Sequence, residues 1–305
     1  MVRNDDALVE LLHQLVDRQY HFTCVTPATH GRVLSRPAPD EPGLRDIFGW
    51  NRHFLAAQLE PELLRLLERS GCVEKNGDQL RSRVRVASLG GRLFLHSSYP
   101  TSSDDSVFLG PDTYRFVRFV LAQRQELERA AWLVDMGAGS GAGGILAGAA
   151  AAIARVTLVD INPAAARLAR INAIAAGAEA SVLVSDQIPR GCDLVIANPP
   201  YMMDISHRTY RDGGAMFGGE LASRWAKEAL ESLGPAGTML LYTGAAVRRG
   251  RLPLVECLQN LCTKADATLD VEEIDPDVFG EELENPAYGE IERIAALGIR
   301  ITKRN

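Results

Sequence analysis

The sequence lacks the features of a membrane or secreted protein. No stretch of its 305 residues approaches the roughly 20 uninterrupted apolar residues of a membrane-spanning helix. Its start, MVRNDDALVELL, is acidic and too poor in apolar residues for a signal peptide. The five cysteines include no C-x-x-C pair and have no histidine at metal-ligand spacing, which argues against a disulfide framework or a zinc site. We therefore expect a cytoplasmic protein with reduced thiols and no metal.

An excess of positive charge is also absent. The formal net charge is −6; residues 1–130 carry 17 basic and 17 acidic side chains, and residues 131–305 carry 16 and 22. Enzymes that act on nucleic acid usually display a basic surface, so the overall charge disfavours such a partner. The stretch RSRVRV at residues 81–86 leaves a local basic patch open. Apolar residues make up 46% and charged residues 24%, as in an ordinary globular protein.

A glycine-rich turn stands at the centre of the chain, in WLVDMGAGSG from Trp132 onward. An apolar strand ends at Asp135, the turn contains Gly137, Gly139 and Gly141, and an Ala-rich stretch that we expect to be helical follows. Glycine allows a tight turn and lets a ligand approach the backbone closely. A strand, a glycine turn and a helix in this order are typical of the first unit of a nucleotide-binding α/β sheet.

Three further apolar strands follow, and each ends in polar residues. RVTLVD ends in Asp160, ASVLVSD ends in Asp186, and CDLVIA is followed by Asn198-Pro199-Pro200-Tyr201. The carboxyl ends of parallel strands share one edge of a sheet, where ligands bind. An ionised carboxylate only accepts hydrogen bonds, so an acid at the end of the second strand suits two ribose hydroxyls.

On these residues the chain resembles the class I S-adenosylmethionine-dependent methyltransferases with an Asn-Pro-Pro-Tyr signature, which methylate nitrogens attached to planar groups. This group includes the HemK-like protein-(glutamine-N5) methyltransferases and the adenine-N6 and guanine-N2 methyltransferases of nucleic acids. The resemblance covers roughly residues 108–305. It implies that residues 106–305 form a Rossmann-like α/β domain with a seven-stranded sheet and use S-adenosylmethionine as cofactor.

The resemblance also implies cofactor contacts. The glycines of the turn would pass close to the methionine part and the ribose, and the acid before them would bind the amino group. The acids ending the second and third strands would bind the ribose hydroxyls and the adenine amino group. A Pro-Asp-Thr turn at residues 111–113 would help to cover the cofactor. Capping of the following segment is the alternative for three of these residues, Asp135, Asp186 and Thr113. The cofactor-binding candidates are Asp135, Gly137, Gly139, Gly141, Asp160, Asp186 and Thr113.

The tetrapeptide suits methyl transfer to a planar NH2 group. We expect the Asn198 side-chain carbonyl and the Pro199 backbone carbonyl to accept hydrogen bonds from that group and to stabilise the positive charge that develops on its nitrogen. Pro199 and Pro200 lack N–H groups and would form a stiff rim, and Tyr201 would stack on the flat substrate. The proton can leave after transfer, so no strong base is required and no role is assigned to a histidine.

Residues 1–105 are expected to form a smaller, mainly helical N-terminal domain that recognises the substrate, with a winged helix as a candidate arrangement. Its arginines allow nucleic-acid binding, while a lid or a packing domain is the alternative. The expected elements are helices over 5–20, 44–59 and 61–69, a loop over 25–43, and a hairpin at Gly90-Gly91 that carries Arg81, Arg83, Arg85 and Arg92.

An acidic segment precedes the last strand. Residues 266–292 contain eleven acids and no Lys or Arg. If the sixth strand is parallel to the others, the segment after it places a negative rim beside the active site, which would repel a phosphate backbone. A solvated connecting loop is the alternative.

Three functions remain open on sequence alone. The leading hypothesis is N-methylation of a glutamine side-chain amide in a protein, such as a translation factor, or of a small amide or amine. The alternatives are methylation of an RNA or DNA base amine, and a cofactor-binding scaffold without transferase activity. The negative charge favours the first over the second, and the intact Asn198-Pro199-Pro200-Tyr201 disfavours the third.

Overall fold

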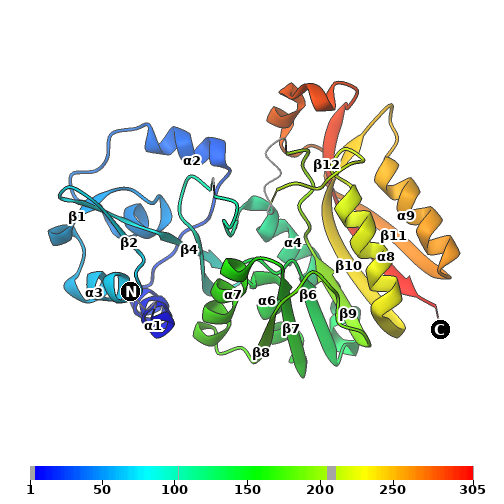
Figure 1. Cartoon of the computed structure of the whole chain (residues 1–305), viewed down its shortest axis with the longest axis horizontal. Coiled ribbons are helices and arrows are strands. Elements are labelled where there is room, and N and C mark those ends of the chain that lie inside the picture. The colour runs from blue at the N-terminus through cyan, green and yellow to red at the C-terminus, as the bar shows by residue number, and fades with distance from the viewer. Residues whose placement is uncertain (1–3, 102, 205–210, 305) are drawn as a thin grey trace.

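A seven-stranded sheet forms the centre of the molecule (Figure 1). The structure, a computed structural model, describes residues 4–101, 103–204 and 211–304. Every strand expected for the sheet is present, and the Rossmann-like α/β fold is confirmed. The strands are β6 (Trp132–Met136), β7 (Arg155–Asp160), β8 (Ala180–Val184), β9 (Cys192–Ala197), β10 (Leu233–Val247), β11 (Ala267–Asp275) and β12 (Arg293–Lys303).

The strand order places the candidate residues at one edge. The order is β11-β12-β10-β9-β6-β7-β8, and only β12 runs against the others. From β6 the chain proceeds outward through β7 and β8 and then returns to β9 on the other side of β6. This reversal separates the connections above neighbouring strand ends and opens a crevice there. Because β11 is parallel to β10, the acidic segment after β11 emerges at the same edge.

Helices cover both faces of the sheet, because alternate strand residues point to opposite sides. Leu133 belongs to the core on one face, with α4, α5, α6 and α7, and Val134 belongs to the core on the other face, with α8 and α9. No helix in the described part of the chain is long and apolar enough to cross a membrane. The helices are α4 (Pro111–Ala122), α5 (Arg124–Arg129), α6 (Ala142–Ala151), α7 (Pro163–Ala175), α8 (Glu220–Ser232) and α9 (Pro253–Lys264).

The N-terminal part combines helices with two small sheets. The strand pairs β1–β3 and β3–β2 form one sheet, and β4–β5 form the expected hairpin. The helices expected near residues 5–20 and 61–69 are present. The elements are α1 (Asp5–Asp17), α2 (Pro27–Leu34), α3 (Pro61–Arg69), β1 (Phe54–Leu55), β2 (Val73–Asn76), β3 (Gln79–Ser82), β4 (Val84–Leu89) and β5 (Arg92–Ser97), with shorter helical turns at Arg45–Gly49 and Ala56–Gln58.

Two expectations for the N-terminal part are wrong. The stretch expected as a loop over 25–43 contains α2, which starts with a proline at its first position and is capped by Thr26, whose side chain accepts from the Thr29 N–H at 3.2 Å. The helix expected over 44–59 is not continuous, because only the short turns at Arg45–Gly49 and Ala56–Gln58 are helical. Phe54 instead pairs with Leu80 across β1 and β3, and a pairing between residues so far apart leaves no local periodicity.

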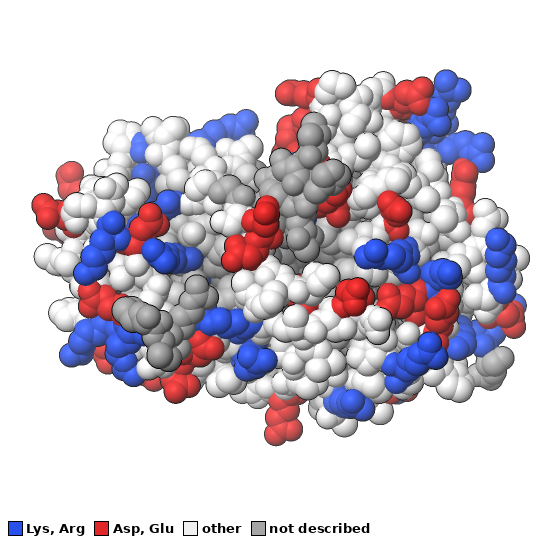
Figure 2. Space-filling model, in the orientation of Figure 1, with Lys and Arg blue, Asp and Glu red and all other residues white. Residues whose placement is uncertain are grey.

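The hairpin arginines do not form a basic face. Arg85 is buried and donates from Nε to the Ser97 carbonyl at 2.9 Å. Arg81 and Arg92 also donate to backbone carbonyls of the chain, and only Arg83 among the four is exposed. On the face shown in Figure 2, Lys and Arg are mixed with Asp and Glu without a continuous basic surface. The nucleic-acid surface considered for these four residues is therefore not present.

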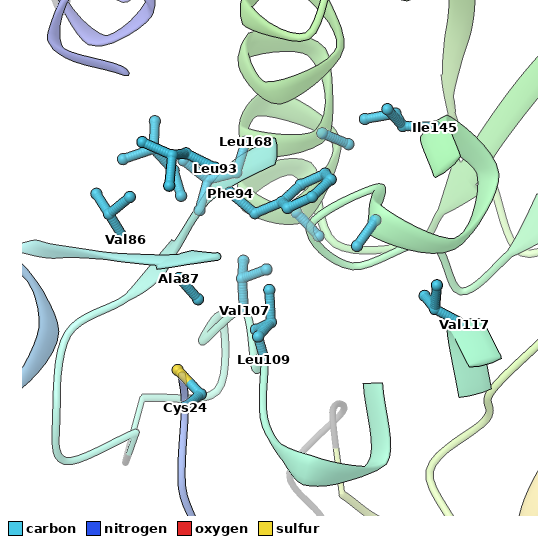
Figure 3. Packing of buried hydrophobic residues seen from close by; sticks show 14 of the residues in the cluster. Cys24, Val86, Ala87, Leu93, Phe94, Val107, Leu109, Val117, Ile145 and Leu168 are labelled. Carbon is cyan, nitrogen blue, oxygen red and sulfur yellow. The ribbon is translucent and has the colours of Figure 1, made fainter. Parts of the chain in front are cut away.

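The hairpin packs against the helices of the large sheet (Figure 3). Val86 and Phe94 of the hairpin belong to one hydrophobic cluster with Leu168 of α7 and Ile145 of α6, and all four are buried. Helix α1 also contacts α7. The N-terminal part and the sheet therefore share a continuous core.

A fully buried asparagine links these parts to the glycine-rich turn. Asn172 of α7 accepts from the Leu95 N–H at 2.8 Å and donates to the Leu95 carbonyl at 3.0 Å. The same amide nitrogen donates to the Ser140 carbonyl in the glycine-rich turn at 2.8 Å. One side chain thus ties β5 to α7 and to the turn.

We predict that Asn172→Ala lowers the free energy of unfolding by about 3 kcal/mol, because it leaves three buried backbone groups without partners. Urea denaturation followed by circular dichroism measures the change. The matched control is Asn76→Ala at an exposed position in β2, which should change the free energy by less than about 0.5 kcal/mol. Equal stability of the two variants would contradict the linking role of Asn172.

Candidate active site

A cavity of about 670 Å3 opens at the carboxyl edge of the sheet. Sites for small molecules have volumes of about 300–1,000 Å3, so the cavity has room for a nucleotide-sized ligand. It brings together all but one of the residues singled out from the sequence. Its lining includes Thr113, Asp135, Gly137, Gly139, Asp160, Asp186, Asn198, Pro199, Pro200 and Tyr201.

The glycine-rich turn leaves room for a ligand beside Asp160. Gly137, Gly139 and Gly141 have φ angles of 70°, 55° and 79°, which strain other residues. A Cβ on Gly139 would meet no atom of the protein within 4 Å, whereas one on Gly141 would lie 3.1 Å from Ile145 and Leu158. Gly141 does not line the cavity, and its missing side chain serves the packing of α6 on the sheet.

Asp160 is held by the backbone on both of its oxygens. Oδ2 accepts from the Gly139 N–H at 2.8 Å, and Oδ1 accepts from the Asn162 N–H at 2.9 Å. Each carboxylate oxygen can accept a second hydrogen bond, so both remain available to hydroxyl groups. Burial raises the pKa of Asp160 above its ordinary value, and the two N–H donors oppose that shift.

Asp135 is more deeply buried, at 2% exposure. Its Oδ2 accepts from the Gly144 N–H in the first turn of α6 at 2.7 Å, which leaves Oδ1 for a ligand. Burial raises the pKa of Asp135 to about 7, and the Asp160 charge adds to this shift while the Gly144 hydrogen bond opposes it. Asp186, by contrast, is exposed on the cavity wall.

The tetrapeptide begins where β9 ends. Asn198 is half-buried on the cavity wall, and its side chain makes no hydrogen bond to a described residue. Pro199 is buried, and neither proline carries an N–H donor. The wall therefore offers acceptor groups to a ligand.

Tyr201 is anchored inside the protein by a carboxylate that the sequence did not single out as a site residue. The Tyr201 hydroxyl donates to Asp112 Oδ2 at 2.6 Å, and the Tyr242 hydroxyl donates to Asp112 Oδ1 at 2.8 Å. A Cβ on Gly244 would lie 2.3 Å from the Tyr201 ring, so the ring packs directly on that strand. Asp112 is 89 and 130 residues from its two partners, and the only sequence signal was the Pro-Asp-Thr turn.

The Pro-Asp-Thr turn also caps its helix. Thr113 Oγ1 accepts from the Gly110 N–H at 3.3 Å, and the Thr113 N–H donates to the Gly110 carbonyl at 2.9 Å. Thr113 lines the cavity as well, so both interpretations of this residue stay compatible with the structure. Asp112 is buried, which raises its pKa, while Tyr201, Tyr242 and Arg115 donate to it and oppose that shift.

The acidic segment after β11 folds against the loop that follows the tetrapeptide. Glu282 forms an ion pair with Arg211, and the Met203 N–H donates to the Tyr288 hydroxyl at 2.8 Å. Asp275 pairs with Arg115 at 3.0 Å. Several acids of the expected negative rim are therefore paired with arginines. Residues 205–210, which include His207, lie outside the described residues.

The N-terminal part supplies one wall of the cavity through Pro27, Tyr99 and Pro100. The Tyr99 ring stacks on His30 with centroids 4.1 Å apart, and the Tyr99 N–H donates to Asn51 Oδ1 at 2.8 Å.

No cluster of potential metal ligands is found among the described residues.

We predict that Tyr242→Phe lowers the free energy of unfolding by about 2 kcal/mol at pH 8 and by less at pH 5. The hydroxyl favours the ionised form of Asp112, so its loss raises the Asp112 pKa further, and the loss of stability grows as pH rises. Urea denaturation at both pH values measures this difference. In the control Tyr114→Phe, the lost hydroxyl accepts from the Cys24 N–H, and the change should not depend on pH.

Comparison with known proteins finds similarity over the part of the chain that contains the glycine-rich turn and the tetrapeptide. Residues 118–262 match the family model of the methyltransferase small domain. A release factor glutamine methyltransferase of Koribacter versatilis is 33% identical over 156 residues, 45% of this chain and 54% of that protein. A ribosomal RNA small subunit methyltransferase C of Pseudomonas paraeruginosa is 25% identical over 210 residues, 68% of this chain and 53% of that protein. The chain thus spans about half the length of these relatives.

A solved structure supports the fold assignment. Trm5b from Pyrococcus abyssi superposes with a TM-score of 0.51 over 76% of this chain and 62% of that chain, at 15% identity. The open space at Gly139, the acceptor oxygens of Asp160 and the acidic wall fit S-adenosylmethionine, the cationic cofactor of this class. The sheet-bearing part of this chain therefore has a class I S-adenosylmethionine-dependent methyltransferase fold, and residues 118–262 within it are similar to the methyltransferase small domain.

Proposed function

We propose that this chain transfers a methyl group from S-adenosylmethionine to a planar NH2 group, and that the acceptor is a glutamine side-chain amide of a protein. The observation that carries the proposal is the placement of Asn198 and Pro199 on the wall of the cavity that also contains Gly139 and Asp160. Acceptor groups for an NH2 group and a pocket for the cofactor thereby share one cavity.

Under this proposal one set of residues binds the cofactor and another binds the acceptor. Bound S-adenosylmethionine would supply a methyl group on a positively charged sulfur. Asp160 would hold the ribose hydroxyls, Asp135 the amino group and Asp186 the adenine amino group. Asn198 and Pro199 would accept from the two N–H groups of the substrate, aim its nitrogen and stabilise the positive charge that grows there. The proton can then leave to water, so a side-chain base is not required.

The charges around the cavity favour a protein amide over a nucleic-acid base. Among the described residues, six acids and two arginines line the cavity. One of the arginines, Arg211, is paired with Asp204 and Glu282, and the other, Arg224, forms no ion pair with a described residue. A phosphate backbone gains affinity by replacing counterions with cationic side chains, and this wall offers few. Two release factor glutamine methyltransferases are 33% and 31% identical to this chain over 156 and 140 residues, against 25% over 210 residues for the ribosomal RNA methyltransferase.

We further propose that residues 1–105 select the acceptor, because Pro27, Tyr99 and Pro100 from this part line the cavity.

The acceptor class is tested with tritiated S-adenosylmethionine and two purified acceptors, an unmethylated bacterial release factor and unmethylated 16S ribosomal RNA. We expect label in the protein, released as N5-methylglutamine on proteolysis, and little change between 50 and 200 mM salt. Label in the RNA, with activity that falls steeply over this salt range, would instead establish a base-amine methyltransferase.

We predict that Asn198→Ala lowers kcat by about 100-fold to 1,000-fold, because one of two acceptors for the developing charge is lost. The dissociation constant of S-adenosylmethionine, measured by isothermal titration calorimetry, should stay within about threefold. Asn76→Ala, at an exposed site that is not part of the cavity lining, is the control and should keep full activity. Unchanged turnover in Asn198→Ala would refute the role of this side chain.

We predict that the affinity for S-adenosylmethionine falls about tenfold from pH 8 to pH 6. Asp135 has a pKa of about 7, so it is ionised at the higher pH and protonated at the lower, and only the ionised form attracts the cationic cofactor. Calorimetric titrations at both pH values measure the affinity. Asp135→Asn should remove the part of the pH dependence that comes from ionisation of Asp135. Asp186→Asn serves as the matched control, because it removes a carboxylate from the same cavity while Asp135 stays in place, and the pH dependence should persist.

A further inference from the structure

Phe279, in the segment between β11 and β12, has an unusual backbone conformation. Its φ of 56° and ψ of 41° are left-handed, a region that a bulky aromatic residue rarely occupies. Such strained residues persist where the surrounding structure forces the conformation, and they gather at ligand sites.

The neighbours of Phe279 hold it in this conformation. The side chain of Val278 is buried, and the Val278 N–H donates to the Ile294 carbonyl at 2.8 Å. On the other side, the Glu282 N–H donates to the Phe279 carbonyl at 2.8 Å, and the Glu282 carboxylate pairs with Arg211. The chain is therefore fixed on both sides of the strained residue.

The Phe279 ring lies at the cavity, next to the tetrapeptide. It lines the cavity and is half-buried. Its centroid is 6.1 Å from that of Tyr201, with the ring planes at 66°, so the two rings meet edge to face. Tyr201 is itself held by Asp112 and packed on Gly244, so its ring has little freedom to turn onto a substrate.

We propose that Phe279 supplies the apolar face that covers the planar group of the acceptor. This inference rests on the proposed function. Two acceptors, Asn198 and Pro199, would fix the NH2 group within its own plane but leave that plane free to tilt. A ring against the flat face removes the tilt, and both constraints are needed to align the nitrogen with the transferred methyl group. Phe279 would thus touch the substrate and make the protein specific for flat amides and amines.

The test replaces Phe279 with glycine, which removes the ring and also tolerates the left-handed backbone. With the same two acceptors, release factor and 16S ribosomal RNA, kcat/KM for the acceptor that the wild-type protein labels should fall about tenfold or more. The dissociation constant of S-adenosylmethionine should not change. The melting temperature should stay within about 2 °C or rise, because strain is relieved as packing is lost.

Two further variants complete the experiment. Phe279→Tyr keeps a flat ring and should restore at least half of the wild-type kcat/KM. Gln19→Gly changes a residue with φ of 53° that does not line the cavity, and it reports the effect of strain relief alone, without loss of activity.

Wild-type kcat/KM in Phe279→Gly would overturn the inference and leave the proposed function standing. A loss of more than about 6 °C in melting temperature would also overturn it, because Phe279 would then be a packing residue. Absence of methyl transfer by the wild-type protein to either acceptor would refute the proposed function itself and, with it, the role of Phe279.

Discussion

A buried carboxylate with two tyrosine hydroxyls is the interaction on which the site depends. Asp112 sits at the start of α4, Tyr201 ends the tetrapeptide and Tyr242 lies in β10, so one side chain joins three segments that are distant in sequence. Removing a carboxylate from water is unfavourable unless donors replace the lost hydration. Both tyrosine hydroxyls are therefore needed beside Asp112, and the contact between Tyr201 and Asp112 fixes the position of the tetrapeptide.

Polar side chains also connect other segments of the site. Asn172 connects the hairpin, α7 and the glycine-rich turn, and Asp160 connects that turn to the start of α7 through its two backbone donors. In both cases a polar side chain, fully buried in Asn172 and partly buried in Asp160, satisfies backbone groups that would otherwise lack partners. The cavity walls are thereby held in position before any ligand arrives, which is the condition for electrostatic stabilisation of a transition state.

The sequence was sufficient for the sheet and for the residues at its strand ends, because both follow from local rules. Apolar runs predict strands, and Asp160 or Asn198 directly after such a run predicts a polar edge. Local rules could not find Asp112 as an anchor or Phe279 on the cavity wall, because their partners come from segments far along the chain. For Arg85 the local rule gave a wrong prediction. A charged residue in a basic stretch suggested an exposed basic surface, but Arg85 is buried and donates a hydrogen bond inside the protein.

The continuous core between the hairpin and the helices of the sheet has a mechanical consequence. Swinging the N-terminal part away would separate Phe94 from Leu168 and break both hydrogen bonds between Leu95 and Asn172. Such a hinge motion would expose apolar surface to water and is opposed by the hydrophobic effect. Admission to the cavity would then not depend on such a hinge motion, and under the proposed function the acceptor amide would have to reach Asn198 between the N-terminal part and the sheet as they stand.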